Sequence, residues 1–495
     1  MSILLQQFMQ SLIPVYPEAV VITVALMVLI LDFFVDKDSK AFLGWFSLAG
    51  IVVAAFATFR LMGAGAGGTF FSGTFNLDPF SIFFKFVFFI ACGLGILVSI
   101  NYLKSQDIHR GEYYSLMLFA TSGMMLMASA ADLITLYLGL ELMAMSIYIL
   151  AGFLRHDNRS NEAAIKYLLL GAFSSGIMLY GMSLLYGLTG TTNLSEILAF
   201  LRTADLNNPV IFLAMIMLVV SFGFKVAAVP FHMWVPDVYE GAPTPVTAFM
   251  SAGPKVAGFA VLLRVFLYSL EPLHAHSTAI LSGLALLTMA VGNIMALSQT
   301  NIKRMLAYSS IAHAGYALVG LAAAAAGGAD NVFKGGGAAS VMLYVCIYAL
   351  MNMGAFGVVI MLRKAGERGE EITDFAGLGK TNKTAASLML IFMFSLTGIP
   401  PTAGFIGKFY IFKSAVQSGL VWLAVAGVLF SSISAYFYLR VIMVMYMKEP
   451  KESIELTTSP SLALALAISV TAVIYIGVLP SEPLDYARAL IAGIM

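Results

Sequence analysis

Apolar segments of about twenty residues recur along the chain, and they restrict its fold more than any motif does. A hydrocarbon core about 30 Å thick is crossed by an α-helix of roughly 20 mostly apolar residues. Fourteen segments approach or exceed that length: 17–35, 41–62, 79–101, 113–130, 132–153, 163–188, 209–232, 243–270, 277–297, 303–324, 337–362, 385–412, 419–447 and 460–480. Only 11% of residues are charged, against roughly 25% in soluble domains. The sequence therefore predicts an all-α polytopic membrane protein with about 14 transmembrane helices.

The distribution of lysine and arginine predicts how these helices are oriented, because cytoplasmic loops carry an excess of both. Loops after odd-numbered segments hold 16 of the 27, loops on the other side hold 6, and 5 lie within or at the edge of segments. We therefore expect an even number of crossings in a bacterial inner membrane, with both termini on the periplasmic side.

Two lysines lie in apolar segments next to residues that break helices. Residues 221–256 contain Lys225 and Lys255. The prolines between them include Pro230, Pro236, Pro243 and Pro245. A charge at membrane depth costs at least a few kcal/mol, so such a lysine is a functional candidate that needs a partner. Pro230 is expected to break the helix beside Lys225, and a broken helix needs protein or water around its freed backbone groups.

A second segment, 396–410, repeats this combination. It places Lys408 beside Gly398, Pro400, Pro401, Gly404 and Gly407. Paired interrupted segments indicate a transport site. Here they are the seventh and twelfth segments, so each repeat has five crossings. Because five is an odd number, the second copy crosses the membrane in the opposite direction. We expect inverted five-helix repeats at 112–271 and 272–459, with broken seventh and twelfth helices, a three-helix segment at 1–111 and a final helix at 460–495. Coincidence of two Gly/Pro clusters is the alternative.

Glu141 is a candidate partner for Lys225. It lies about nine residues into the fifth segment, where burial of an isolated carboxyl favours its neutral form. Beside Lys225 both groups can stay charged, and separating them would make the lysine release its proton. The alternative is a static salt bridge between helices.

Two histidines and two further lysines extend this set. His232 follows Lys225 by seven residues, nominally on the same helix face, and is a possible relay because histidine titrates near neutrality; a hydrogen-bonded interface residue is the alternative. His313, about ten residues into the tenth segment, lies near mid-membrane. Lys255 and Lys408 are the deepest remaining cations, with snorkelling as the alternative.

Three other charged residues have two interpretations each. Lys85 lies near the start of a segment and either has a function or snorkels to the surface. Asp237 and Glu240 fall at a cytoplasmic mouth, where they either collect protons or cap helices. Capping is the favoured interpretation for both.

The sequence contains no cofactor motif. Cys92 and Cys346 are its only cysteines, so neither a disulfide framework nor a metal cluster is expected. There is no G-x-G-x-x-G or Walker loop. A net charge of +1 gives no reason to expect nucleic acid as a partner. The expected partners are the lipid bilayer, protons and other proteins.

Several of these stretches resemble one family. They are FKVAAVPFHMWVPDVYEGAPTPVTAFMSAGPKVAG, YLGLELMAMSIYILAGF, NEAAIKYLLLGAFSSG, NIKRMLAYSSIAHAGY and LTGIPPTAGFIGKFYIF. Over about 250 residues they resemble the antiporter-like membrane subunits of respiratory NADH:quinone oxidoreductase, complex I. Within the family, the stretch VPDVYEGAPTPVTAF is most similar to the N-type branch. The M type is expected to carry glutamate at the position of Lys408, and the L type a long lateral helix after the last span. Neither feature is found in this sequence.

The resemblance implies fourteen helices, inverted five-helix repeats and one proton channel. By position, Glu141, Lys225, Lys255 and Lys408 match the family's buried glutamate and lysines, and His313 matches a polar position. It implies no cofactor in this chain, with NADH, FMN, iron-sulfur clusters and quinone in partner subunits. The implied partners are antiporter-like M and L subunits and small membrane subunits.

We therefore expect a proton-translocating membrane subunit of a bacterial NADH:quinone oxidoreductase, driven by quinone reduction elsewhere in the complex. One alternative is a subunit of a multi-subunit Na+/H+ antiporter, recognisable by sodium-dependent exchange without NADH oxidation. Another is a stand-alone secondary transporter, which would take up solute as the purified chain. A third is a purely structural bundle with static charge pairs.

Overall fold

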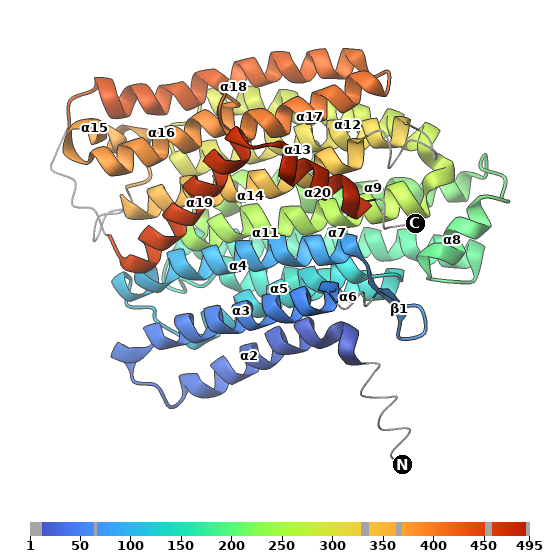
Figure 1. Cartoon of the computed structure of the whole chain (residues 1–495), viewed down its shortest axis with the longest axis horizontal. Helices are drawn as coiled ribbons and strands as arrows, with labels where there is room; N and C mark the ends of the chain where they lie inside the picture. The colour runs from blue at the N-terminus through green and yellow to red at the C-terminus, as the bar shows by residue number, and fades with distance from the viewer. Residues whose placement is uncertain (1–11, 64–66, 328–335, 363–368, 451–457, 492–495) are drawn as a thin grey trace.

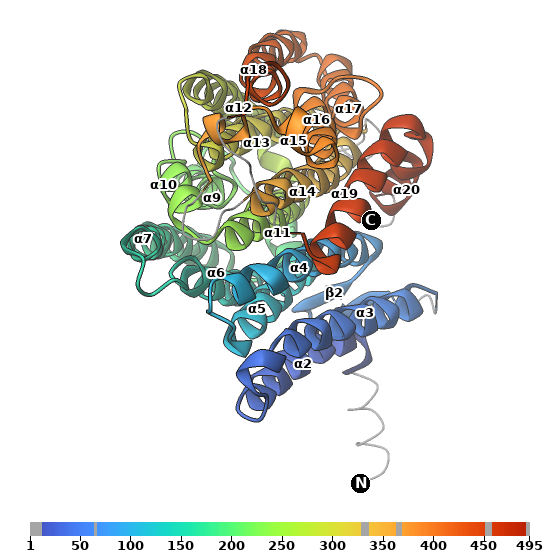
Figure 2. The same ribbon diagram turned by 90° about the vertical axis from the view of Figure 1, so that its left-hand side faces the viewer.

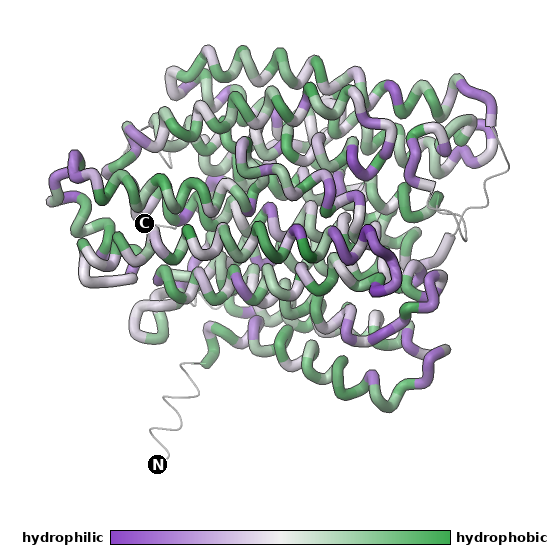
Figure 3. The backbone as a smooth tube through the Cα atoms, turned by 180° about the vertical axis from the view of Figure 1, so that it is seen from behind, coloured by the Kyte–Doolittle hydropathy of each residue, from purple (hydrophilic) through white to green (hydrophobic). Residues whose placement is uncertain are grey.

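The computed structural model describes residues 12–63, 67–327, 336–362, 369–450 and 458–491, in which long helices run side by side (Figure 1). Within these residues, 12 helices are long and apolar enough to cross a membrane. Hydrophilic residues gather mainly towards the ends of the helices (Figure 3). These features confirm a helical, polytopic membrane protein. A short antiparallel hairpin, β1 (Gly68–Phe70) and β2 (Phe75–Leu77), departs from the all-α prediction.

The first long helices form one side of the bundle (Figure 2). They are α2 (Tyr16–Asp32), α3 (Ala41–Gly63), α4 (Pro79–Ser105) and α5 (Gly111–Ser129), with short 3-10 turns at Ile13–Val15 and Lys37–Ser39. The start of α4 is encoded locally: the Asp78 carboxylate accepts a hydrogen bond from the Ser81 amide at 2.7 Å, and the Ser81 hydroxyl accepts one from the Asp78 amide at 3.0 Å. Pro79 occupies the first helical position, where its missing N–H is not needed.

The middle of the chain supplies six helices. They are α6 (Leu133–Ala151), α7 (Asn158–Thr189), α8 (Leu194–Leu201), α9 (Pro209–Val226), α10 (Trp234–Gly241) and α11 (Thr244–Leu262), which continues as a π-helical stretch over Leu263–Ser269. Asp132 starts α6 by accepting hydrogen bonds from the amides of Ile134 and Thr135. This cap fixes the boundary between α5 and α6.

The second half of the chain packs against α11. Its helices are α12 (His274–Leu297), α13 (Ile302–Ala326), α14 (Gly337–Met361), α15 (Leu378–Thr381), α16 (Lys383–Thr397), α17 (Ala403–Gln417), α18 (Val421–Met447), α19 (Pro460–Val478) and α20 (Ser481–Ile491), with 3-10 turns at Glu271–Leu273 and Ile372–Phe375. Helices α11, α13 and α14 are almost entirely buried and form the centre of the bundle (Figure 2). Small residues let neighbours approach closely: a Cβ on Gly292 of α12 would lie 2.5 Å from the Ala312 amide nitrogen of α13.

Both predicted interruptions are present, but the first lies earlier than expected. Helix α9 ends at Val226, where Ala227 adopts the left-handed conformation with φ 65°, four residues before Pro230. Helix α16 ends at Thr397, followed by Gly398 with φ 90°. Because α9 ends so early, His232 lies in the connection to α10, and the expectation that it shares a helix face with Lys225 is wrong.

Candidate functional site

Lys225 lies in the last turn of α9 and points into the protein, with 6% of the residue exposed. Its Nζ donates a long hydrogen bond of 3.4 Å to the Tyr148 hydroxyl of α6 and lies 5.8 Å from the centre of that ring. Tyr148 lies seven residues after Glu141, on the same face of α6. Glu141 and Tyr148 therefore lie on one face of α6, and Tyr148 contacts Lys225.

Glu141 and Lys225 are not in direct contact. The Glu141 carboxylate accepts a hydrogen bond from the Ser175 hydroxyl of α7 instead, and no ion pair joins the two charged groups, both of which are described. A contact ion pair needs about 4 Å or less between nitrogen and oxygen. In this structure the pair is separated, and a static salt bridge between α6 and α9 is absent.

Lys255 lies at the centre of the bundle on α11, one residue after Pro254. Its amine donates to the Ser310 carbonyl oxygen at 2.7 Å and to the Ser310 hydroxyl oxygen, both on α13. The Tyr348 hydroxyl of α14 donates to the same Ser310 oxygen at 2.7 Å. With 3% of Lys255 exposed, snorkelling is excluded.

His313 lies one turn beyond Ser310 on α13, between two tyrosine hydroxyls. Its Nδ1 is 2.6 Å from the hydroxyl of Tyr344 on α14, and its Nε2 is 3.2 Å from that of Tyr438 on α18. Tyr438 also shares a hydrogen bond with Ser309. A neutral imidazole has one donor and one acceptor nitrogen. One hydroxyl must therefore donate to the ring while the other accepts from it.

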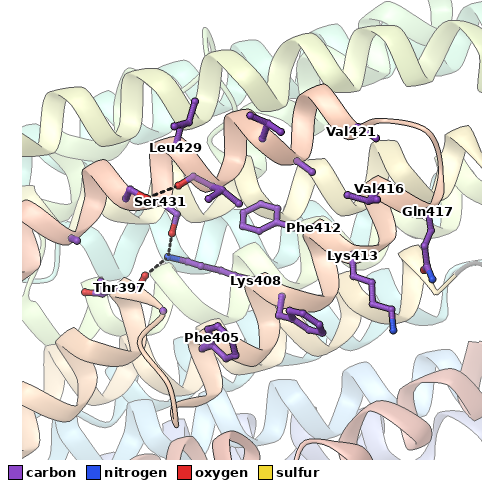
Figure 4. Close-up of a pocket in the computed structure, with 17 residues that line it drawn as sticks. Thr397, Phe405, Lys408, Phe412, Lys413, Val416, Gln417, Val421, Leu429 and Ser431 are labelled. Atoms are coloured by element: carbon purple, nitrogen blue, oxygen red, sulfur yellow. Dashed lines mark hydrogen bonds between the residues drawn. The ribbon is translucent and has the colours of Figure 1, made fainter.

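Lys408, on α17, is held by the end of the broken helix α16 (Figure 4). Its Nζ donates to the carbonyl oxygens of Leu396 and Thr397 at 3.0 and 2.8 Å, and to the Ser431 hydroxyl of α18 at 2.9 Å. The last carbonyls of a helix have no partner within it and carry partial negative charge. The interruption after Thr397 thus supplies the ligands for the buried ammonium, of which 4% is exposed.

These groups form a row across the bundle with breaks between its hydrogen-bonded parts. Among the described side chains, Lys225 with Tyr148, Lys255 with Ser310, the His313 group and the Lys408 group are not joined by a direct hydrogen bond. The His313 and Tyr348 ring centres are 5.2 Å apart, and Lys408 Nζ lies 4.9 Å from the Tyr316 ring centre. Single waters bridge gaps of this kind in many proteins.

His232 lies outside this row. Its Nδ1 is buried and has no hydrogen-bond partner among the described residues. The ring also has a hydrogen bond with the Pro230 backbone, which is the kind of contact that the interface alternative expects.

Asp237 and Glu240 of α10 are paired with cations and do not cap helices, so the favoured interpretation of both is wrong. Asp237 accepts from Lys166 of α7 at 2.7 Å and from Arg304 of α13 at 2.9 Å, and Glu240 accepts from Arg304 at 2.9 Å. Burial raises the pKa of the Asp237 carboxyl, but its hydrogen bonds to Lys166 and Arg304 outweigh burial and lower that pKa. Helix α10 is thus fastened to both halves of the chain.

Lys85 does not snorkel to the surface. It is fully buried on α4 and forms a 2.7 Å ion pair with Glu18 of α2. Its Nζ also lies 5.1 Å from the centre of the Phe75 ring. This pair joins two N-terminal helices and is separate from the row.

Sequence reasoning missed the hydroxyl groups of the row: Tyr148, Ser175, Ser310, Tyr344, Tyr348, Ser431 and Tyr438. With 21 tyrosines in the chain, no single one stands out. The one usable signal was local, because Ser309 and Ser310 precede His313 by four and three residues and so share its helix face. Within the described residues, no group of three or more His, Cys, Asp and Glu side chains is placed to hold a metal.

Comparisons with known proteins agree on one family. Residues 130–434 match the family described as NADH:quinone oxidoreductase/Mrp antiporter, TM. The chain is 48% identical to NADH-quinone oxidoreductase subunit N of Trichlorobacter lovleyi, covering 96% of each chain. It is 50% identical to NADH-quinone oxidoreductase subunit N 2 of Rhizobium meliloti, covering 95% of this chain and 96% of that one.

Solved structures have the same fold. A chain of respiratory complex I from Thermus thermophilus with bound aureothin is 31% identical, with a TM-score of 0.80, over 96% of this chain and 100% of that one. A chain of the Mrp complex from Dietzia sp. DQ12-45-1b has a TM-score of 0.81 at 18% identity, over 98% of this chain and 97% of that one. The second likeness shows a shared fold only.

Proposed function

The chain belongs to the NADH:quinone oxidoreductase/Mrp antiporter family, with relatives named subunit N over nearly its whole length, and from this membership we propose how its buried residues move protons. It is a proton-translocating membrane subunit of an NADH-quinone oxidoreductase. What the family does not give is the route through this chain.

We propose that the proton passes from Lys225 to Lys255, then to His313, and from there to Lys408. The observation that carries this route is that all four side chains are buried in protein, each within 3.4 Å of a hydroxyl group, which can both accept and donate a proton. Waters would close the gaps between the four groups. Quinone reduction in neighbouring subunits would drive the row by moving Glu141 towards or away from Lys225.

His232 would be a side relay. Its unpartnered, buried Nδ1 lies in the break between α9 and α10 and could take a proton from water entering there. The charged cluster of Asp237, Glu240 and Arg304 joins α10, the helix that follows His232, to the start of α13. In this proposal the cluster would lie where water enters.

Fourteen crossings are also part of the proposal. The 12 candidate spans leave out α5, which has 19 residues, and the interrupted pair α16 and α17, with 15 each. Adding α5 and the interrupted pair gives 12 + 1 + 1 = 14. The two interruptions, at 227–233 and 398–402, support inverted repeats at 112–271 and 272–459. The excess of lysine and arginine after odd crossings supports a periplasmic position for both termini.

The remaining components belong to neighbours. M- and L-type subunits and small membrane subunits would flank this chain, and NADH, FMN, iron-sulfur clusters and quinone would be bound by partner subunits. The likeness to an Mrp complex concerns the fold, whereas the relatives of highest identity described above are all NADH-quinone oxidoreductase subunits.

Replacing Lys225 by alanine tests the route. Proton pumping by the assembled complex in vesicles should fall at least tenfold, because the first buried amine is lost while the fold keeps its other contacts. The matched control is the double variant Glu18→Gln, Lys85→Met, which removes a buried lysine outside the row together with its partner and should leave pumping per assembled complex unchanged. Equal pumping by Lys225→Ala and wild type would contradict the route.

A further inference from the structure

We propose that the groove between α17 and α18 binds a membrane phospholipid, with its phosphate near Lys413 and one acyl chain extending towards Lys408 (Figure 4). The groove has a volume of about 990 Å³, at the upper end of the ~300–1,000 Å³ found for ligand sites. Lys408, one of the buried row, is among its lining residues.

The distance from the surface end of the groove to Lys408 matches the depth of one leaflet. Along α17 the lining runs from Phe405 to Gln417, the last residue of that helix, and Lys408 lies nine residues before Gln417. Nine residues of α-helix span about 14 Å at a rise of roughly 1.5 Å per residue. Half of a hydrocarbon core about 30 Å thick is roughly 15 Å. With Gln417 at the surface, Lys408 is at the depth where the acyl chain of one leaflet ends.

The lining between the two ends is hydrocarbon. It includes Phe409, Phe412, Val425, Val428 and Leu429. Apart from the half-buried Phe412, these side chains are 49–61% exposed. An exposed, concave apolar surface within a membrane is occupied by acyl chains unless protein covers it.

The ends of the groove carry the polar groups. Lys413 and Gln417 lie at the surface end, and Figure 4 shows both directed away from Lys408. Lys413 has no ion pair with another described residue, and the lining includes no Asp or Glu. A lysine near the membrane surface extends its amine to the level of lipid phosphates. The surface end therefore suits an anionic headgroup. No acidic side chain in the lining neutralises Lys413 in its place.

A lipid acyl chain in this groove would cover the side of the Lys408 site that faces the membrane. Lys408 is part of the lining, and its amine is held there by the Thr397 carbonyl and the Ser431 hydroxyl, two residues that also line the groove. The methylene groups of Lys408 precede the amine along the same side chain. An acyl chain against those methylenes would exclude water from that side, so protons would reach the amine only from within the bundle. This consequence rests on the proposed proton route, whereas the lipid site does not.

The site can be tested by photolabelling the assembled complex. The complex is placed in phosphatidylcholine vesicles containing phosphatidylglycerol with a diazirine at the end of one acyl chain, irradiated and digested. Mass spectrometry should locate the label on α17 and α18, above the labelling of lipid-facing α3. Val425→Trp, which fills the groove, should remove most of this label. Val53→Trp, an equally exposed position on α3, is the matched control and should leave it unchanged.

The headgroup contact has its own variant. Lys413→Gln should lower labelling at limiting probe about fivefold, the factor for roughly 1 kcal/mol, which is the usual contribution of one lysine near an anionic surface. Labelling of α17 and α18 no higher than α3, no response to Val425→Trp, or cross-links from these helices to a neighbouring subunit would each overturn the site. No response to Lys413→Gln would overturn the assigned headgroup position. None of these results bears on whether Lys225→Ala blocks pumping.

Discussion

Tyr438→Phe removes one hydroxyl from the middle of the row and should slow proton pumping without changing the packing of the bundle. The hydroxyl lies 3.2 Å from His313 Nε2 and shares a hydrogen bond with Ser309. Tyr438 is fully buried, so water from the surface does not replace the missing group. Phenylalanine keeps the ring and its contacts.

The size of the effect follows from the lost partner. A buried polar group deprived of its hydrogen bond costs roughly 1–3 kcal/mol. If the proton leaves His313 through Nε2, that cost is added to the barrier of this step, and the step slows about 5- to 150-fold. Tyr344→Phe acts on Nδ1, on the other side of the ring, and should have an effect of the same order. An imidazole that only fills space would tolerate both changes.

The assay is acidification of vesicles by the assembled complex during NADH oxidation, recorded together with the oxidation rate. Tyr113→Phe is the matched control, because Tyr113 is equally buried and its hydroxyl is 2.9 Å from the Ser99 hydroxyl, away from the row. Both variants lose a buried hydroxyl contact and should lose similar stability. Only Tyr438→Phe should pump slowly. A Tyr438→Phe complex that assembles fully and pumps at the wild-type rate would refute the assignment of His313 and Tyr438 to the route.

Two further predictions concern the Lys408 site and the charged cluster on α10. Ser431→Ala removes one of three hydrogen bonds to the Lys408 amine and should slow pumping about tenfold, a loss of roughly 1.4 kcal/mol. Ser432→Ala is the control, because the Ser432 hydroxyl bonds its own helix. Equal pumping rates for the two variants would argue against Lys408 as an exchange site. Asp237 has a lowered pKa in the folded chain, so its pairing stabilises the fold above the ordinary carboxyl pKa of 3.8 and is lost as pH falls through the lower, folded value. Asp237→Asn should therefore lower the thermal midpoint at pH 7, with the difference from wild type shrinking in acid; a difference that stays constant with pH would contradict this.

The buried charges were predictable from the sequence because membrane insertion leaves so few options for a lysine. Lys225, Lys255 and Lys408 each lie within long apolar segments, and all three are buried in the bundle. The hydropathy of a segment and the residues that break a helix are properties of neighbouring positions in the chain, so both can be recognised from the sequence alone. The same holds for the interruption after Thr397, where Gly398 adopts positive φ.

Partners far apart in the chain were not predictable. Lys85 pairs with Glu18, 67 residues away in sequence, and Glu141 is bonded to Ser175 and not to Lys225. Which of several polar residues reaches a buried charge depends on helix rotation and depth, and neither is encoded locally. The first break was predictable in the same way as the second, because α9 ends at Val226, beside Lys225 and four residues before Pro230, although the left-handed turn at Ala227 was not foreseen.

The two broken helices give their lysines different hydrogen-bond partners. At the end of α9 the Gly223 carbonyl accepts from the Ala228 amide, and the Phe224 carbonyl accepts from the Trp234 indole at 3.1 Å. Those acceptors are therefore occupied, and among the described residues Lys225 keeps one long bond, to Tyr148.

At the end of α16, by contrast, the carbonyls of Leu396 and Thr397 both face Lys408, and with Ser431 they satisfy all three N–H groups of the ammonium. A charged amine is stabilised by each such bond. A proton at Lys408 is therefore held by three protein acceptors, whereas one at Lys225 is held by a single long hydrogen bond and by the charge of the nearby Glu141. Its release from Lys408 then requires a second charge to approach, or α16 and α17 to move apart, and this step would couple the chain to its neighbour.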